Sequence, residues 1–263
     1  MKLMFNTPAI IFSREIDMIF NKVKLATYSK LSAVLLSFAL SSSAFSAIVV
    51  DRTRIVVDKD NVVTAINVRN KNDTFPFLAQ SWIEDEKGEK INKYFTVIPP
   101  IQRVEPDTKS MIRIQRLEDY LELPQDRESL FYFNVREIPP QSNAENLLQI
   151  ALQTKLKLFY RPKSISNHDL VRPFREVKVS VKDSKIILNN PTPYYLALVA
   201  LTGNDTQIDI DSENIAPFSQ KELGIKTKSL NKVSAVFIDD FGGKPNVNFN
   251  CDAQGECHVI PEK

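Results

Sequence analysis

Apolar and polar residues alternate along residues 147–162. The apolar positions are Leu148, Ile150, Leu152, Leu156, Leu158 and Tyr160. This period of two is typical of a β-strand with one apolar and one polar face. The run is longer than the ~5–6 residues of an ordinary strand. It is therefore either one long core strand, or a strand whose first half overhangs its own core and offers Leu148, Ile150 and Leu152 to a partner.

Short segments rich in β-branched or alternating apolar residues precede this run, and turn-forming residues separate them. These segments are residues 48–57, 62–68, 77–84, 95–100, 110–115 and 130–137. None of them keeps an apolar period of 3.6 residues, so the sequence predicts little helix. About seven strands without βαβ units favour an antiparallel β-sandwich.

Residues 161–173 interrupt the pattern with prolines and few apolar side chains, and we interpret them as a linker. Further strands are predicted beyond it, at residues 177–181, 185–188, 194–201, 207–210, 233–237, 247–249 and 258–260. This second part is long enough for a smaller β-sandwich. The sequence thus predicts an all-β protein with two domains, residues 47–166 and residues 167–263.

Residues 1–46 have the pattern of a secretory signal. Basic residues precede the apolar run 31–40, and small residues follow it up to Ser46. The run is shorter than the ~20 apolar residues of a membrane span. We therefore expect removal of residues 1–46, export to the periplasm and a mature chain that starts at Ala47. Met18 is an alternative translation start, because the residues before it exceed such a signal.

Removing this leader changes the charge of the protein. The whole chain has a formal net charge of +2, and residues 1–46 contain five basic and two acidic residues. The mature chain is therefore left with a net charge of −1. No overall basicity remains that would argue for a nucleic-acid partner.

The two cysteines, Cys251 and Cys257, both lie in the exported part of the chain. A cysteine pair in an oxidising compartment usually forms a disulfide, which here would pin the C-terminal end. A metal site is the alternative, but only His258 lies nearby and zinc takes four ligands. The sequence favours the disulfide and predicts no metal.

Signatures of an enzyme are absent from the sequence. His168 and His258 are the only histidines, which leaves little material for a Ser-His-Asp arrangement. The six glycines form no phosphate-binding loop. We expect no catalysis, no cofactor and no small-molecule substrate, so the functional surface should be one that binds another macromolecule.

Several motifs, in the same order, resemble those of the periplasmic fimbrial chaperones of the chaperone–usher pathway. They are Asp51-Arg52-Thr53-Arg54, Ala79-Gln80-Ser81-Trp82-Ile83-Glu84, Pro99-Pro100, the segment LPQDRESLFYFNVREIPP at 123–140, the strand end KLFYRP at 157–162, and NPTPYY at 190–195. The resemblance covers essentially all of residues 47–263. It implies two immunoglobulin-like β-sandwich domains in an L or boomerang arrangement, with a binding cleft between them.

The same resemblance implies how such a protein acts. It would lend a strand to pilus subunits whose own sandwich lacks one, a process called donor-strand complementation, and deliver them to an outer-membrane usher. Leu148, Ile150 and Leu152 match the donated apolar residues. The short loop at 138–146 resembles the short-loop class of these chaperones, which serves rod-like adhesive pili.

Charged residues also match the family. Arg54 and Lys157 correspond to the cleft residues that bind the C-terminal carboxylate of a subunit, for which a guanidinium fork and an ammonium are suitable donors. Glu128, Arg161 and Asp240 correspond to a charge cluster between the domains. However, Lys157 has the opposite parity to the apolar positions, so on a regular strand its side chain must leave from the other face.

Two other interpretations remain open. A pilus subunit or adhesin is also exported and β-rich, but it should carry an alternating N-terminal extension and an incomplete sandwich. An exported carbohydrate-binding module would favour exposed aromatic residues, whereas Trp82 and most of the Phe and Tyr residues lie on predicted strands.

Overall fold

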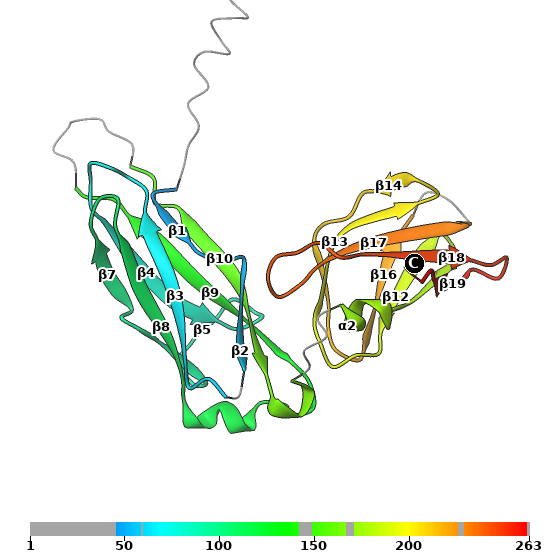
Figure 1. Cartoon of the computed structure of the whole chain (residues 1–263), viewed down its shortest axis with the longest axis horizontal. Helices are drawn as coiled ribbons and strands as arrows, with labels where there is room; N and C mark the ends of the chain where they lie inside the picture. Colours follow the sequence, from blue (N-terminus) through cyan, green and yellow to red (C-terminus); the bar gives the residue numbers. More distant parts are fainter. Residues whose placement is uncertain (1–45, 59, 142–148, 167–170, 226–228, 262–263) are drawn as a thin grey trace, which may run out of the picture. The chain divides into compact units, whose positions relative to one another are not determined.

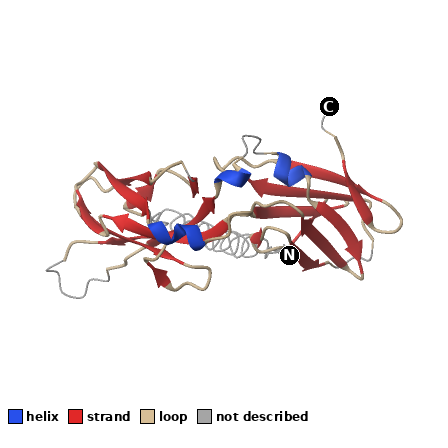
Figure 2. Cartoon of the chain, turned by 90° about the horizontal axis from the view of Figure 1, so that it is seen from below, coloured by secondary structure: helices blue, strands red, loops and turns tan. Residues whose placement is uncertain are grey.

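The computed structural model describes residues 46–58, 60–141, 149–166, 171–225 and 229–261. The predicted signal up to residue 45 and Leu148 lie outside the described residues. Ser46–Lys263 form one compact unit, and this unit contains two separate hydrophobic cores. Strands dominate around both cores (Figures 1 and 2). We call the strands β1 to β10 the first domain, and the elements from α2 to β19 the second domain.

Two sheets form the first domain. One has the strand order β1-β3-β8-β6, and the other has the order β2-β10-β9-β4-β5, with β7 paired to β4. The bounds are β1 Ile48–Val50, β2 Arg54–Asp58, β3 Val63–Asn70, β4 Phe77–Glu84, β5 Lys90–Ile91, β6 Phe95–Ile98, β7 Ile101–Val104, β8 Lys109–Arg116, β9 Ser129–Ile138 and β10 Gln153–Arg161. Both sheets contribute to one core, as Ile66, Ile112, Phe133 and Leu158 illustrate, all fully buried. This is the predicted β-sandwich.

The predicted strand at residues 48–57 is in fact two strands. β1 pairs with β3 in one sheet, whereas β2 pairs in parallel with β10 in the other. Asp51 still donates its backbone N–H to the Asn67 carbonyl of β3 at 3.1 Å, and the chain leaves this sheet in the polar residues that follow. The chain thereby crosses from one sheet to the other and brings Arg54 next to β10.

The long alternating run is only partly a strand. β10 begins at Gln153, and its residues Leu156 and Leu158 are buried in the first core. Ile150 and Leu152 precede the strand and are 63% and 39% exposed. Gln153 opposite Arg136 is the last register pair with β9, and beyond it the Leu152 carbonyl still accepts the backbone N–H of Glu137 at 2.9 Å. A single long core strand is therefore wrong, and the apolar pattern extends beyond the core.

One continuous sheet forms the second domain. Its strand order is β14-β13-β17-β18-β19-β11-β12-β16, and β15 pairs with β13. The bounds are β11 Lys178–Lys182, β12 Lys185–Asn190, β13 Leu196–Gly203, β14 Thr206–Ile208, β15 Glu213–Ile215, β16 Ser219–Gly224, β17 Lys232–Ile238, β18 Asn246–Cys251 and β19 Glu256–Val259. Side chains from β11, β12, β13, β17 and β18 share one core, so the sheet folds over on itself.

Several strands and helices with few apolar residues were not predicted from the sequence. β15 and β16 have few buried side chains, and β5 and β7 are short strands that pair only with β4. Three short helices were also missed: η1 Glu118–Glu122, η2 Lys163–Ile165 and α2 Arg172–Arg175. α2 lies in and just beyond the predicted linker and buries Pro173 and Phe174.

A disulfide joins Cys251 and Cys257, as predicted. The two cysteines face each other in the β18–β19 pair, and Cys257 belongs to the second core.

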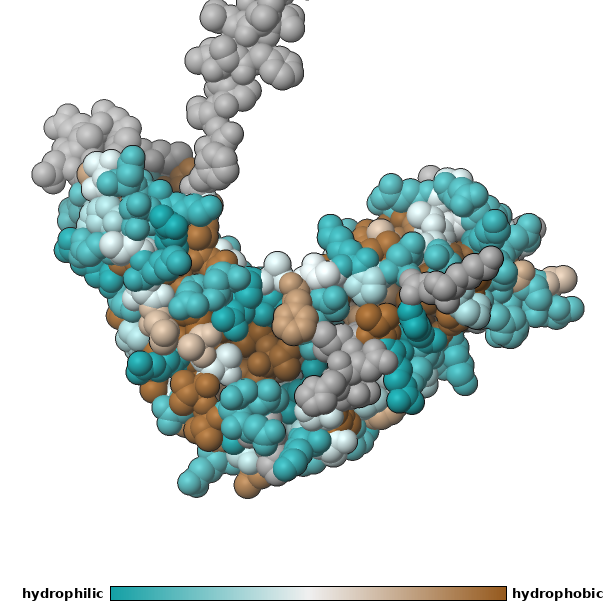
Figure 3. Space-filling model, in the orientation of Figure 1, coloured by the Kyte–Doolittle hydropathy of each residue, from teal (hydrophilic) through white to brown (hydrophobic). Residues whose placement is uncertain are grey.

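Among the described residues there is no helix of sufficient length and apolarity to cross a membrane. In the view of Figure 3, apolar side chains reach an otherwise largely hydrophilic surface in several places.

Candidate functional site

Arg54 and Lys157 come together on adjacent strands. Lys157 of β10 is the register partner of Arg54 of β2, so both side chains lie on the same face of the sheet. The next pair, Leu158 and Ile55, points into the first core and is fully buried. The opposite parity of Lys157 is thereby explained: the core takes one face of β10, and the two cations leave from the other face.

That other face contacts the second domain. Arg54 donates a hydrogen bond from Nη1 to the Ile238 carbonyl at 2.8 Å. Its guanidinium carbon lies 5.8 Å from the centre of the Phe159 ring. Lys157 donates from Nζ to the Oδ1 atom of Asn214, a residue of β15. Each cation is thus held by a neutral oxygen of the second domain.

Partial removal from water makes this cation pair unfavourable for the stability of the free protein. Arg54 is only 7% exposed, and its buried Nε makes no hydrogen bond within the described part of the chain. Burial lowers the pKa of Arg54, an effect opposed by the charges of Asp240 and Asp239. Burial and then the charge of Arg54 lower the pKa of the Lys157 ammonium. Arg54 is buried and Lys157 half-buried, a pair of like charges that an anion would stabilise.

Acidic residues that lie near this pair in space or in sequence are held by other groups. Asp240 binds Arg161, and Glu213, next to Asn214 in the chain, binds Lys221 at 2.7 Å. Asp239 accepts the backbone N–H groups of Phe241 at 2.9 Å and Gly243 at 2.7 Å. Among the described residues, neither Arg54 nor Lys157 therefore has a carboxylate partner.

A tight turn carries the second domain's contribution to the site. Gly242 has a φ of +86°, which favours glycine. A side-chain carbon at Gly243 would lie 2.3 Å from the Asp239 carboxylate, so only glycine allows that carboxylate to cap the turn. This turn follows Ile238 and contains Asp240, and it thereby fixes a contact of Arg54 and a partner of Arg161.

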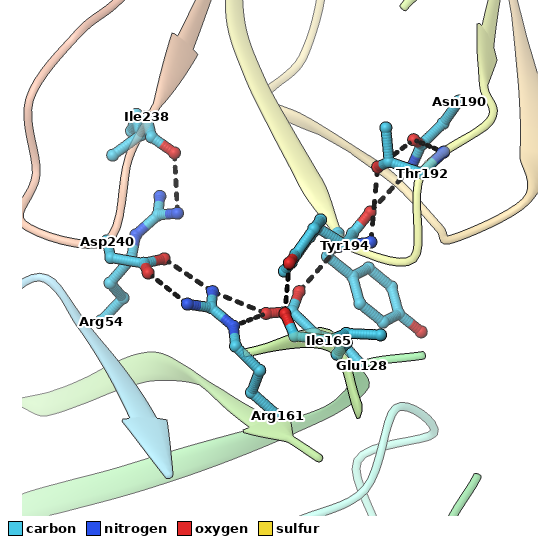
Figure 4. A network of polar contacts seen from close by, with 10 residues as sticks. Arg54, Glu128, Arg161, Ile165, Asn190, Thr192, Tyr194, Ile238 and Asp240 are labelled. Carbon is cyan, nitrogen blue, oxygen red and sulfur yellow. Dashed lines mark hydrogen bonds and ion pairs between the residues drawn. The ribbon is translucent and has the colours of Figure 1, made fainter. Parts of the chain in front are cut away.

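Glu128, Arg161 and Asp240 form one network (Figure 4). Arg161 donates to Glu128 Oε1 at 2.7 Å and to both oxygens of Asp240, at 2.7 and 3.1 Å. The other Glu128 oxygen accepts the backbone N–H of Tyr195 at 2.7 Å. Burial would lower the pKa of Arg161, but the two carboxylates raise it. Burial raises the pKa of Glu128, and Arg161 opposes that rise. The network joins residues of both domains.

The structure also shows residues that the sequence did not single out. Asn214 lies in a short polar strand without alternation, and the Ile238 group is a backbone carbonyl, so neither carries a local signal. Tyr195 donates a hydrogen bond from its hydroxyl to Glu86 at 3.1 Å, which makes Glu86 a further link between the domains. Ile150 and Leu152 lie outside this polar site, and Leu148 is not among the described residues.

Both domains match known protein families. Residues 47–166 match the N-terminal domain of the PapD pili and flagellar-assembly chaperones, and residues 172–249 match the C-terminal domain of the PapD pili assembly chaperone. The Escherichia coli chaperone protein PapD is 42% identical over 233 residues, which cover 84% of this chain and 93% of PapD. The Proteus mirabilis chaperone protein PmfD is 37% identical over 235 residues, covering 87% and 92%.

Solved structures agree with these sequence relatives. The E. coli chaperone DraB superimposes with a TM-score of 0.69 at 30% identity, covering 79% of this chain and 98% of DraB. A chain from the complex of the Salmonella enterica SafA pilin with the SafB chaperone gives a TM-score of 0.71 at 25% identity, covering 80% and 98%. In domain content, domain order and fold, this protein belongs to the family of fimbrial, or pili assembly, chaperones.

Proposed function

We propose that this chaperone holds pilus subunits in the periplasm through two contacts. Arg54 and Lys157 anchor the C-terminal carboxylate of the subunit, and Leu148, Ile150 and Leu152 supply the strand that the subunit lacks. Delivery to an outer-membrane usher follows from the resemblance to chaperone–usher proteins. The observation that carries the proposal is the cation pair on adjacent strands, with Arg54 buried and Lys157 half-buried, which has no carboxylate partner among the described residues.

A C-terminal carboxylate suits this pair physically. It brings one negative charge and up to four acceptor sites to a guanidinium and an ammonium on neighbouring strands. A subunit that ends there would place its last strand along β10, whose register with β2 fixes the position of both cations. The anchor would thus set the register of the added strand as well as contribute affinity.

The exposed apolar residues support the second contact. Ile150 and Leu152 continue the alternation of Leu156 and Leu158 but lie outside the core. Covering such residues contributes roughly 1.5–3 kcal/mol per side chain. Strand addition satisfies the unpaired backbone at the same time. In the SafA–SafB complex, a chaperone related to this chain is bound to a pilin.

A pilus subunit is the less favoured alternative. Both chaperone domain models match the chain in order, and each domain has its own complete core. A subunit would instead have a sandwich that leaves part of its core uncovered.

The two contacts can be tested by co-purification of subunits with the periplasmic protein. Arg54→Ala and Lys157→Ala should each weaken capture by about ten- to a hundredfold, because loss of a charge-assisted hydrogen bond costs roughly 1.5–3 kcal/mol. Replacement of Leu148, Ile150 and Leu152 together by serine should abolish capture. Circular dichroism should show that all these variants are folded.

Matched controls separate binding from folding. Lys178→Ala removes an exposed cation of the second domain and should not change capture. Leu158→Ala, in the same alternating run but fully buried, should destabilise the protein by about 2–5 kcal/mol. If the triple variant unfolds, the apolar segment belongs to the core and the strand contact is wrong. Normal capture by Arg54→Ala and Lys157→Ala would place the carboxylate elsewhere.

A further inference from the structure

Asn214 is the residue of the second domain that contacts the proposed anchor. It lies at the centre of β15 and is the register partner of Ala197 in β13, so its backbone is fixed by the second sheet. Its side-chain oxygen accepts the hydrogen bond from Lys157 Nζ. This contact decides where the ammonium lies, because a lysine side chain has four rotatable carbons and is otherwise free to point elsewhere.

The side-chain amide of Asn214 also carries a donor group, Nδ2. Lys157 donates only, so it must face Oδ1, and the Nδ2 group on the same amide carbon remains available as a donor. Within the described part of the chain, Nδ2 makes no hydrogen bond. An anion bound by Lys157 would therefore meet a further N–H donor at this position.

An amide suits this position better than a carboxylate. A carboxylate would pair with Lys157 and compete with the incoming anion, whereas a neutral amide orients the ammonium and leaves its charge available. The neighbouring Glu213 is withdrawn from the site by its ion pair with Lys221 at 2.7 Å. Arg54 is the charged group that faces Lys157 from β2.

We propose that Asn214 is a positioning residue of the carboxylate anchor: its Oδ1 holds the Lys157 ammonium, and its Nδ2 is the third donor to the C-terminal carboxylate of a subunit. The inference rests on the proposed function of Arg54 and Lys157. It adds that the second domain takes part in recognising the carboxylate rather than only supporting the first.

The first test needs no subunit. The pKa of Lys157 is measured by NMR titration of its side-chain carbon signals in the wild type and in two variants. Asn214→Ala removes the acceptor and should lower the pKa of Lys157 further. Asn214→Asp places a carboxylate on the ammonium and should raise it. Asn248→Asp, an exposed asparagine of β18 with the same charge change, should leave it unchanged. An unchanged titration of Lys157 in both Asn214 variants would overturn the proposal.

The second test uses an N-acetylated peptide of alternating threonine and valine, either with a free C-terminal carboxylate or as its carboxamide. Calorimetry should show that the wild type prefers the carboxylate form. Asn214→Ala should reduce this preference by about tenfold, the effect of losing one hydrogen bond to a charged group. Asn214→Asp should remove the preference, and Asn248→Asp should keep it.

The outcomes distinguish the two proposals. If the wild type binds both peptide forms equally, the anchor itself is wrong. If Arg54→Ala and Lys157→Ala lose the preference while both Asn214 variants keep it, the anchor is correct and the role of Asn214 is rejected. Asn214→Gln retains the amide and should recover part of the preference that Asn214→Ala loses, which an effect on folding alone would not produce.

Discussion

At the scale of single residues, the anchor shows a conflict between binding and stability. Arg54 and Lys157 lie on paired strands and are held by neutral oxygens. Folding therefore brings two cations together, buries Arg54 and half-buries Lys157. This pair lowers the stability of the free protein, and we expect binding of an anion to offset that loss.

This cost leads to a prediction for Lys157. Its pKa is lowered in the folded protein, so the unfolded chain holds the proton more tightly. The ammonium therefore penalises folding at neutral pH. The penalty begins to fall as pH rises through the lowered pKa and is gone above the pKa of the unfolded chain. Lys157→Met should unfold at a higher urea concentration than the wild type at neutral pH, and the difference should shrink at alkaline pH.

Lys178→Met is the matched control, because Lys178 is exposed; its urea midpoint should stay close to that of the wild type. A lower midpoint for Lys157→Met would mean that the packing of the lysine outweighs its charge. The same variant should not retain subunits, because a methionine cannot donate to a carboxylate.

At the scale of elements, strand pairing determines where the core residues and the anchor residues lie. One face of β10 packs into the first core, and the other face carries the cation Lys157. The exposed residues Ile150 and Leu152 precede the strand. The parallel β2–β10 pair brings Arg54 to this strand. The β18–β19 pair contains the disulfide and no part of the anchor.

The disulfide should therefore affect stability without affecting binding. It closes a short segment, since the cysteines are six positions apart. The double variant Cys251→Ser, Cys257→Ser should lose less than ~3 kcal/mol in urea unfolding and should capture subunits like the wild type under conditions in which it is folded. Loss of capture by the folded variant would show that β18 and β19 take part in binding.

At the scale of the whole molecule, polar contacts rather than a shared core connect the domains. The cores are separate, whereas Arg161 binds Glu128 and Asp240, and Glu128 also holds the Tyr195 backbone. Arg161 and Glu128 are largely buried. Such a network is sensitive to the loss of one member, because the remaining charges stay buried without compensation.

Glu128→Ala should accordingly lower the free energy of unfolding by a few kcal/mol. Glu86→Ala would be a natural comparison, but Glu86 accepts a hydrogen bond from Tyr195, so the exposed Glu118 is the cleaner control. Urea unfolding should show a large loss for Glu128→Ala and almost none for Glu118→Ala. Equal stability of these two variants would contradict a linking role for the network.

The sequence by itself determined the elements that depend on local pattern. The segment 77–84 was predicted as a strand and forms β4 with these bounds, and the two cysteines predicted their own disulfide. The all-β class followed for the same reason, because a period of two positions side chains on the faces of a strand whatever lies next to it. The residues of the candidate site were found only through the family resemblance, since an isolated Arg54 or Lys157 has no local signal.

Tertiary structure decided which strands lie next to each other. The sequence predicted one strand at residues 48–57 and one long strand at residues 147–162. The fold split the first between two sheets, and of the second only residues 153–161 form the strand β10. It also placed Asn214 beside Lys157. Backbone hydrogen bonds are nearly the same for every sequence, so alternation fixes which side chains share a face, but only the packing of whole sheets selects their neighbours.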